Sequence, residues 1–433
     1  MGIYTSYSEE WIDAKVVSKL DLISNIILKN IQGIRSIILT GGFGRGEGSV
    51  RLVGNNEINL LKDFDIVVIV DPIPSEDKKN KILEQIYNEL GLRNAELERF
   101  RFSKFVVDIR YLKKRDLAYS DIWFYDFKSA SKVLYGQSVA NLTPYNADDI
   151  PFSSGFRILF EKVTGLLGHF SYEYVRGTKI ETSKNDSLVY ECLKAYIEMG
   201  TVLCILAKRY KPSYVDRMKI IKTIYKSDFN DLAQEIPNLP ELIERATIFK
   251  LKPDAFIVEK DPVELWFSTR NDLGIIIRYY LSKYSGLPIS NWTGLQQLKK
   301  YLIKTYYMPL LESWLRQRSG IFNSRLVIPV NYLYHILTNI EYIYQLKNNE
   351  NRLYFKPLAR LISPSLKFYL AAPLVLFAID RTGKVRDDYI NLFFNELKFC
   401  IPIEINEDEN IWENARNLYL KAYRLYNGFH LIK

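Results

Sequence analysis

The sequence RSIILTGGFGRGEGS, residues 35–49, passes directly from an apolar segment into a loop rich in glycine. The run Ile37-Ile38-Leu39 predicts a short buried strand, because a brief apolar run bounded by turn residues is typical of one. The glycines between residues 41 and 48 leave the backbone N–H groups uncovered, since glycine has no Cβ. Such a turn after a strand can close on phosphate oxygens, so the stretch predicts a phosphate-holding loop.

This loop departs from three well-known phosphate-binding motifs. A P-loop ends in Gly-Lys-Ser/Thr, and residues 41–49 contain no lysine. The dinucleotide fingerprint needs a third glycine after Gly44 and Gly46, where this chain has Ser49. A protein kinase needs HRD and DFG motifs, but HRD is absent and residues 63–65 read DFD. The loop is therefore not explained by any of these classes.

Two carboxylates precede the next apolar run, in DFDIVVIV at residues 63–70. Residues two apart in a strand share a face, so Asp63 and Asp65 are expected to project together. Neighbouring carboxylates repel each other and lose hydration unless a divalent cation lies between them. The alternative is a turn aspartate beside a strand-start aspartate, both exposed to water.

A third carboxylate, Asp108, falls inside a predicted strand at residues 102–112. Phe105, Val107 and Ile109 alternate with Val106 and Asp108 in this segment, which is the period of a strand. A carboxylate among apolar strand residues is costly unless it is paired or bound to a metal. An edge strand that exposes Asp108 to water is the alternative.

Together, these elements resemble the DNA polymerase β-like nucleotidyltransferase superfamily over roughly the first 135 residues. In that family an apolar strand ends in Gly-Gly or Gly-Ser, Asp-apolar-Asp/Glu follows, and a later strand carries a third carboxylate. The matching residues here are Gly41 and Gly42, Asp63 and Asp65, and Asp108. The segment at residues 43–47, FGRGE, is also similar to the continuation of the motif in prokaryotic members. The 20 residues between Gly42 and Asp63 exceed the usual family spacing, which an insertion would explain.

The resemblance implies a two-metal reaction, with Mg²⁺ ions about 3.5–4 Å apart that clamp an in-line displacement. Asp63 and Asp65 would hold both ions, and Asp108 would complete one shell and favour deprotonation of an acceptor hydroxyl. A nucleoside monophosphate would pass from an NTP to that hydroxyl, with release of pyrophosphate.

The nucleotide phosphates would be held by Gly41, Gly42 and Arg45, because arginine offers a planar fork of donors to phosphate. A salt bridge of Arg45 with Glu47 or another neighbour is the alternative role. In the helical half, Lys194 could face the triphosphate and Tyr214 could stack on the base. Ordinary packing is the favoured interpretation of those two residues.

The predicted fold class is α+β, a small mixed-sheet domain followed by a large all-helical region. Helical periodicity dominates beyond about residue 150. A break near residues 237–253 divides this region, so the expected domains are a nucleotidyltransferase domain at 1–140 and helical domains at 150–255 and 256–433.

The composition limits the function further. Lys and Arg outnumber Asp and Glu by 59 to 50, a net charge of +9 that favours nucleotides or nucleic acid as partners. The three cysteines form no CxxC pair, which argues against a thiolate zinc site, and the three histidines are scattered, which argues against a histidine cluster. Any catalytic site is therefore expected to use carboxylates. The chain has no run of about 18 apolar residues and no signal-type start, which predicts a cytoplasmic protein with no membrane partner.

The sequence leaves several classes of molecule as the acceptor of the nucleoside monophosphate. The positive charge slightly favours an RNA end over a small molecule, as in antibiotic-modifying relatives, or a protein hydroxyl, as in toxin-like enzymes. A catalytically silent module that binds nucleotide or RNA is a different class of answer. The oligomeric state is not indicated.

Overall fold

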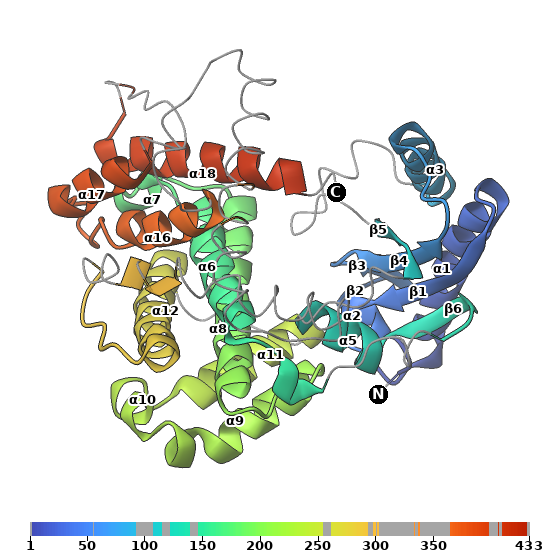
Figure 1. Cartoon of the computed structure of the whole chain (residues 1–433), viewed down its shortest axis with the longest axis horizontal. Helices are drawn as coiled ribbons and strands as arrows, with labels where there is room; N and C mark the ends of the chain where they lie inside the picture. The colour runs from blue at the N-terminus through green and yellow to red at the C-terminus, as the bar shows by residue number, and fades with distance from the viewer. Residues whose placement is uncertain are drawn as a thin grey trace. The chain divides into compact units, whose positions relative to one another are not determined.

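The computed structural model describes residues 2–54, 56–91, 107–114, 122–138, 146–253, 261–292, 298–299, 301–302, 333, 337, 364–397, 406 and 409–430. Contacts divide the chain into two compact units. The first comprises Met1–Pro151, Cys204–Phe229 and Asn238–Glu259, and the second comprises Phe152–Leu203, Asn230–Pro237 and Lys260–Lys433. A small mixed sheet lies near the N-terminus and a large helical region follows it (Figure 1), which confirms the predicted α+β class.

The sheet of the first unit has four strands in the order β5-β4-β1-β6. These strands are β1 (Ile34–Thr40), β4 (Phe64–Val70), β5 (Val107–Leu112) and β6 (Lys132–Gly136). Strand β1 runs antiparallel to β4 and β6, whereas β4 and β5 are parallel. The apolar runs at residues 37–39 and 66–70 therefore form the two central strands, as their composition predicts.

The long spacer between the glycine loop and the carboxylates contains a β-hairpin. Its strands are β2 (Val50–Val53) and β3 (Glu57–Leu60), paired from Val50 opposite Leu60 to Val53 opposite Glu57. Positive backbone φ angles at Gly54 and Asn56 mark the turn. Cross-strand pairing thus organises the spacer into a two-stranded ribbon.

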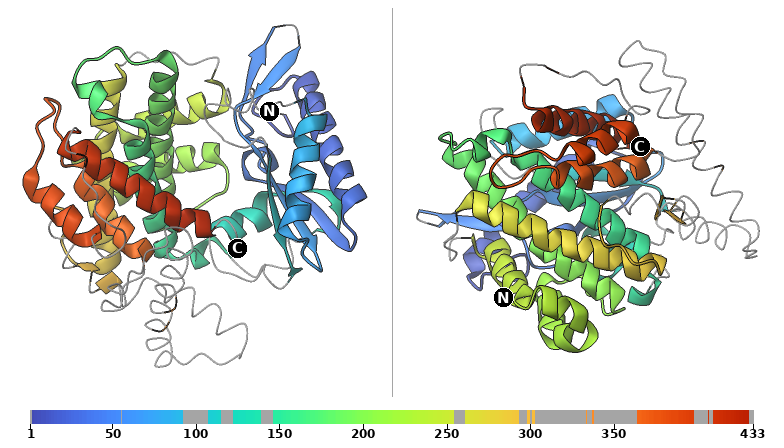
Figure 2. Two further views of the ribbon diagram at one scale, coloured as in Figure 1. Left: turned by 90° about the horizontal axis from the view of Figure 1, so that it is seen from above. Right: turned by 90° about the vertical axis from the view of Figure 1, so that its left-hand side faces the viewer.

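The two faces of the sheet are covered by different helices. Helices α1 (Glu10–Asn30) and α3 (Glu76–Glu89) lie along one face (Figure 2), where Ile66 and Val68 of β4 join their core. Val67 and Ile69 point the other way and pack with Phe127 of α5 (Ile122–Ala130). Asp65 shares the parity of Val67, so its side chain belongs to the α5 face.

Two helices from the later sequence belong to the first unit. They are α9 (Tyr214–Asp228) and α11 (Leu239–Leu251), which pack against each other. The Ser49 hydroxyl donates a hydrogen bond to the carbonyl of Lys250 at 2.6 Å, and the Ser6 hydroxyl donates to the carbonyl of Leu251 at 2.9 Å. The compact units thus differ from the expected boundaries at residues 140 and 255, because they group α9 and α11 with the sheet.

The second unit is built from helices packed through aromatic side chains. Near its centre the rings of Phe170 and Trp266 stack at 3.7 Å. Apart from an isolated bridge between Ile379 and Val385, its described residues form no strand. Its helices are α6 (Phe152–His169), α7 (Tyr172–Val175), most of α8 (Thr182–Leu206), α10 (Asn230–Glu235), α12 (Pro262–Ser285), α16 (Pro364–Leu376), α17 (Asp387–Leu397) and α18 (Ile411–His430).

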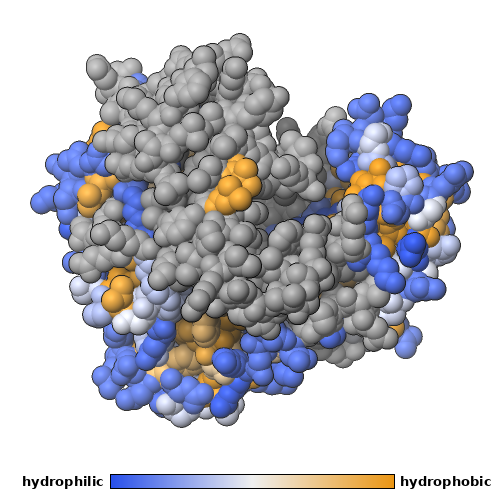
Figure 3. Space-filling view, viewed as in Figure 1, coloured by the Kyte–Doolittle hydropathy of each residue, from blue (hydrophilic) through white to orange (hydrophobic). Residues whose placement is uncertain are grey.

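Hydrophilic side chains dominate the coloured surface in Figure 3, where apolar groups form separate patches. Among the described residues, no helix is long and apolar enough to cross a membrane. The apolar segment at residues 369–379 is buried and falls largely within α16, as a core helix would.

Candidate active site

The sheet register brings two of the three predicted carboxylates side by side. Asp65 lies opposite Asp108 in the parallel pair β4–β5, and on its other side it lies opposite Thr40 at the end of β1. Asp63 precedes β4 by one residue and is two positions from Asp65. Because the glycine loop starts directly after Thr40, the carboxylates and the loop meet at one end of the sheet.

Electrostatics show that the three carboxylates act on one another. Burial, together with the charges of Asp63 and Asp108, raises the pKa of Asp65 from 3.8 to about 6, against the opposing effect of Arg45 and Arg110. Burial also raises the pKa of Asp108, although Arg110 opposes this shift. The site therefore concentrates negative charge that the neighbouring arginines offset only partly.

The donor set suits a divalent ion, but these carboxylates are not arranged around one. Carboxylate oxygens are the ligands that Mg²⁺ takes in proteins. Within the described part of the chain, however, no three His, Cys, Asp or Glu side chains are grouped as ligands of one metal. Asp108 instead forms an ion pair with Arg110 at 3.6 Å. A shared ion would therefore have to compete with Arg110 for Asp108, and metal binding stays a prediction.

Gly41 fits closely against the carboxylate of Asp65. Its φ angle is +63°, and a Cβ built on it would lie 1.8 Å from Oδ2 of Asp65. Only a residue without a side chain can occupy this position while Asp65 keeps its orientation. Gly42 is less restricted, because its Cβ would lie 3.3 Å from the carbonyl oxygen of Glu47. Gly41, where the requirement for glycine is stronger than at Gly42, thus contacts a predicted catalytic carboxylate.

We expect Gly41→Ala to displace Asp65 and to lower at least tenfold the nucleotidyl transfer that the resemblance implies, beyond the backbone strain of about 1 kcal/mol that alanine suffers at positive φ. Gly54→Ala is a matched control, since Gly54 also has a positive φ of +52° but no atom lies within 4 Å of a Cβ there. Unfolding free energies and transfer rates of both variants separate strain from displacement. Equal rates in the two variants would contradict the proposed contact.

Arg45 lies buried between two carboxylates. Its guanidinium approaches Glu47 at 3.6 Å and Asp126 of α5 at 3.3 Å. The sequence left open a phosphate contact or a salt bridge, and the salt bridge with Glu47 is the one observed. Since these carboxylates hold Arg45 inside the protein, a role at phosphates stays a prediction.

Glu47 joins the glycine loop to the start of α9. It is fully buried and accepts hydrogen bonds from the Ser213 hydroxyl at 2.7 Å and from the N–H groups of Tyr214 at 2.9 Å and Val215 at 3.1 Å. A carboxylate at this place satisfies helix N–H groups that have no partner within the helix and complements the helix dipole. These hydrogen bonds hold the glycine-rich loop against α9, which starts more than 160 residues later in the chain.

A polar network continues from this contact. Tyr210 donates a hydrogen bond to Asp126 at 2.8 Å, and Arg217 donates to the Tyr210 hydroxyl at 3.1 Å. The guanidinium groups of Arg45 and Arg217 lie 4.8 and 4.6 Å from the centre of the Tyr214 ring. Tyr210, Tyr214 and Arg217 thus lie together around the start of α9, and the Tyr214 ring already contacts two cations. Its stacking on a base stays a prediction.

Lys194 belongs to the second unit, on α8. Burial lowers the pKa of Lys162 on α6, and the charge of Lys194 lowers it further. Lys194 thus acts on a group of its own unit, and a contact with a triphosphate stays a prediction.

Asp126 is the site residue that the sequence did not single out. It lies in an aromatic helix, FYDF at residues 124–127. An acidic residue among aromatic neighbours is the sequence feature that could have identified it. Its partners Arg45 and Tyr210 are more than 80 residues away in the chain on either side. Only the folded arrangement shows that it fixes Arg45 beside the carboxylates.

Comparison of the chain with models of protein families, with curated proteins and with solved structures finds no match in any of the three.

Proposed function

We propose that the first unit transfers a nucleoside monophosphate from an NTP to an acceptor hydroxyl, as members of the DNA polymerase β-like superfamily do. The observation that carries the proposal is the pairing of Asp65 with Asp108 across β4–β5, with Gly41 against the Asp65 carboxylate. A buried carboxylate with its pKa raised to about 6 beside two others is costly to maintain without a use.

In this proposal Asp63, Asp65 and Asp108 hold divalent cations, which would neutralise the triphosphate and lower the pKa of the acceptor hydroxyl. Asp108, opposite Asp65 in the register, would complete the shell of one ion and favour deprotonation of the acceptor hydroxyl. The loop at Gly41 and Gly42 would present backbone N–H groups to the phosphates.

Arg45 and Glu47 act as positioning residues in the proposal. Their ion pair at 3.6 Å and the contacts of Glu47 with α9 keep the glycine loop in one conformation. A preorganised loop lowers the cost of ordering the site when nucleotide binds.

RNA is the favoured acceptor, because the net charge of +9 attracts a polyanion. A small molecule or a protein hydroxyl is the alternative acceptor class. A cytoplasmic location belongs to the proposal, because nucleoside triphosphates are held there.

The test incubates the full chain and Mg²⁺ with each of the four NTPs labelled at the α-phosphate, together with total RNA, protein or small-molecule fractions of a lysate. We expect label to enter one fraction, and a γ-phosphate label to appear in pyrophosphate instead. Asp63→Asn serves as the inactive control. Binding of NTP without transfer to any fraction would favour the silent nucleotide-binding module.

A further inference from the structure

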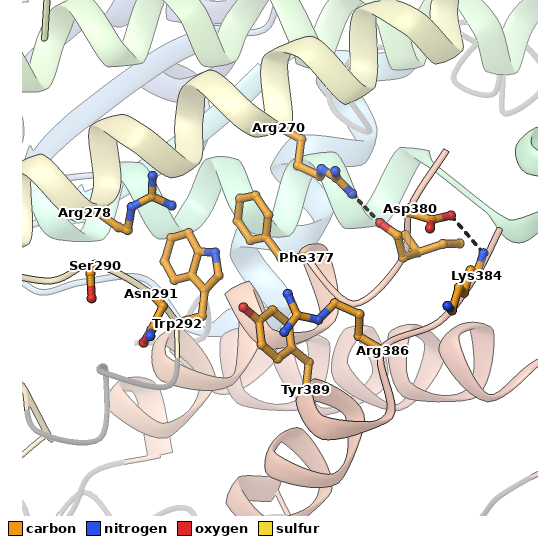
Figure 4. A pocket seen from close by; sticks show the side chains of 11 residues that line it. Arg270, Arg278, Ser290, Asn291, Trp292, Phe377, Asp380, Lys384, Arg386 and Tyr389 are labelled. Atoms are coloured by element: carbon orange, nitrogen blue, oxygen red, sulfur yellow. Dashed lines mark hydrogen bonds between the residues drawn. The ribbon is translucent and has the colours of Figure 1, made fainter. Parts of the chain in front are cut away.

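The second unit contains a pocket of about 490 Å³ between α12 and the segment from the end of α16 to the start of α17 (Figure 4). Four cationic side chains line it, Arg270, Arg278, Lys384 and Arg386, against one carboxylate, that of Asp380. The formal charge of the lining is therefore +3. A pocket of this size matches small-molecule sites, which span about 300–1,000 Å³.

The single carboxylate that lines the pocket, that of Asp380, accepts hydrogen bonds from residues of its own turn. Asp380 accepts hydrogen bonds from the N–H and hydroxyl of Thr382 at 2.8 and 2.7 Å and from the N–H of Lys384 at 3.0 Å. The hydrogen bonds from Thr382, foremost that of its hydroxyl, keep the pKa of Asp380 below its ordinary value, so it stays ionised as a turn residue. Among the described residues no ion pair joins Asp380 to Arg270, although the charge of Asp380 raises the pKa of Arg270.

Arg270 is a buried cation whose hydrogen bonds go to uncharged groups. It is 9% exposed and donates to the carbonyl of Ile379 at 2.5 Å and to the side-chain oxygen of Asn271 at 3.2 Å. In the part of the chain that the structure describes, no carboxylate pairs with it. Burial, together with the nearby charge of Arg381, lowers its pKa to about 10, against the opposing charge of Asp380. Buried charges in proteins are ordinarily paired, so this cation calls for an anionic partner.

Aromatic rings hold the other guanidinium groups in place. Arg278 lies 5.8 Å from the ring centre of Trp292, and Arg386 lies 3.8 Å from that of Tyr389, as Figure 4 shows. A guanidinium held against a ring keeps its N–H donors at the edge, where they can reach another group. Arg386 has one competing partner, Asp388, at 2.9 Å.

We propose that this pocket binds a phosphorylated small molecule, with Arg270, Arg278 and Arg386 as the phosphate-binding side chains. Planar guanidinium groups bind phosphate through paired hydrogen bonds, which suits three arginines around one cavity. Lys384 adds a flexible fourth charge at the rim. The inference does not depend on the proposed transfer reaction, because all of these residues belong to the second unit.

The test is calorimetric titration of the full chain with inorganic pyrophosphate in the presence of a metal chelator. Without metal the carboxylates of the first unit repel this anion, so binding reports on the pocket. We expect Arg278→Gln and Arg386→Gln each to weaken binding about tenfold, the effect of losing a hydrogen bond to a charged group. These two side chains are less buried than Arg270, so both variants are expected to fold.

Arg176→Gln is the matched control, since Arg176 is also an exposed arginine over a tyrosine ring, 5.1 Å from that of Tyr172, but lies outside the pocket. Asp388→Asn should tighten binding several-fold, because it releases Arg386. A wild-type chain that does not bind millimolar pyrophosphate would overturn the proposal. Equal affinity in the wild type and in the pocket variants would overturn it too, whatever the outcome of the transfer assay.

Discussion

Replacing Asp65 with asparagine is expected to abolish nucleotidyl transfer and at the same time to stabilise the metal-free protein. Loss of one charged group of a preorganised site lowers rates by about 10²-fold or more. The stability gain has a separate cause, because burial, Asp63 and Asp108 together raise the pKa of Asp65 from 3.8 to about 6. The folded protein therefore holds the ionised carboxylate at a cost that asparagine removes.

The sign of the pH dependence follows from this raised pKa. Above pH 6 the folded state bears the full cost of ionised Asp65, on the order of 2–3 kcal/mol for a pKa raised from 3.8 to about 6. As pH falls from 6 toward 4, Asp65 takes up a proton in the folded state first, so the wild type gains stability relative to Asp65→Asn. Denaturant unfolding at pH 7 and pH 4 should thus show a large difference at pH 7 and almost none at pH 4.

Asp71→Asn is the matched control for this experiment. Asp71 follows the same strand, is exposed and pairs with Lys113 at 3.0 Å. We expect this variant to keep full transfer activity and wild-type stability within about 0.5 kcal/mol. Wild-type transfer rates in Asp65→Asn, or lower stability of that variant at pH 7, would contradict the account of Asp65.

The second large effect is expected for Glu47→Ala, with a loss of about 3–5 kcal/mol in unfolding free energy. Glu47 is fully buried, so its removal leaves Asp126 as the remaining ion-pair partner of Arg45 among the described residues and leaves the N–H groups of Tyr214 and Val215 without the Glu47 acceptor. Thermal and denaturant unfolding measure the loss.

Glu57→Ala is the control for that loss, since Glu57 pairs with Lys15 at 3.1 Å on the surface. Such exposed pairs contribute about 0–1 kcal/mol. Similar stabilities of the Glu47 and Glu57 variants would show that the connection between the loop and α9 does not stabilise the first unit.

The local patterns of the sequence predicted the central part of the fold correctly. Ile37, Ile38 and Leu39 lie buried in β1, as their short apolar run predicted. The apolar run at residues 66–70 became a strand buried on both faces, between α1 and α3 on one side and α5 on the other. Periodicity determines such features because each depends on residues a few positions apart.

Contacts between distant segments could not be predicted in this way. The parallel pairing that sets Asp65 opposite Asp108 joins strands more than 35 residues apart, and part of the predicted strand at residues 102–106 lies outside the described residues. The capping of α9 by Glu47 spans a still longer separation. Helical periodicity beyond residue 150 predicted α9 as a helix, whereas α11 occupies residues where a break was expected.

Arg45 illustrates the same limit at a single residue. Its position in the glycine-rich motif suggested a phosphate contact, whereas the fold surrounds it with Glu47 and Asp126. The motif identifies which residues are near the site but not which partner each one takes, because the partner comes from a separate element.

Mn²⁺ binding, followed by electron paramagnetic resonance with a non-hydrolysable NTP analogue, measures whether Asp63, Asp65 and Asp108 share a divalent cation, as we propose. We expect Asp108→Asn to weaken Mn²⁺ binding at least tenfold, as loss of a charged ligand does. Arg110→Gln should strengthen it, because Arg110 holds Asp108 in an ion pair at 3.6 Å. Unchanged Mn²⁺ affinity in Asp108→Asn, or weaker binding in Arg110→Gln, would contradict the shared site.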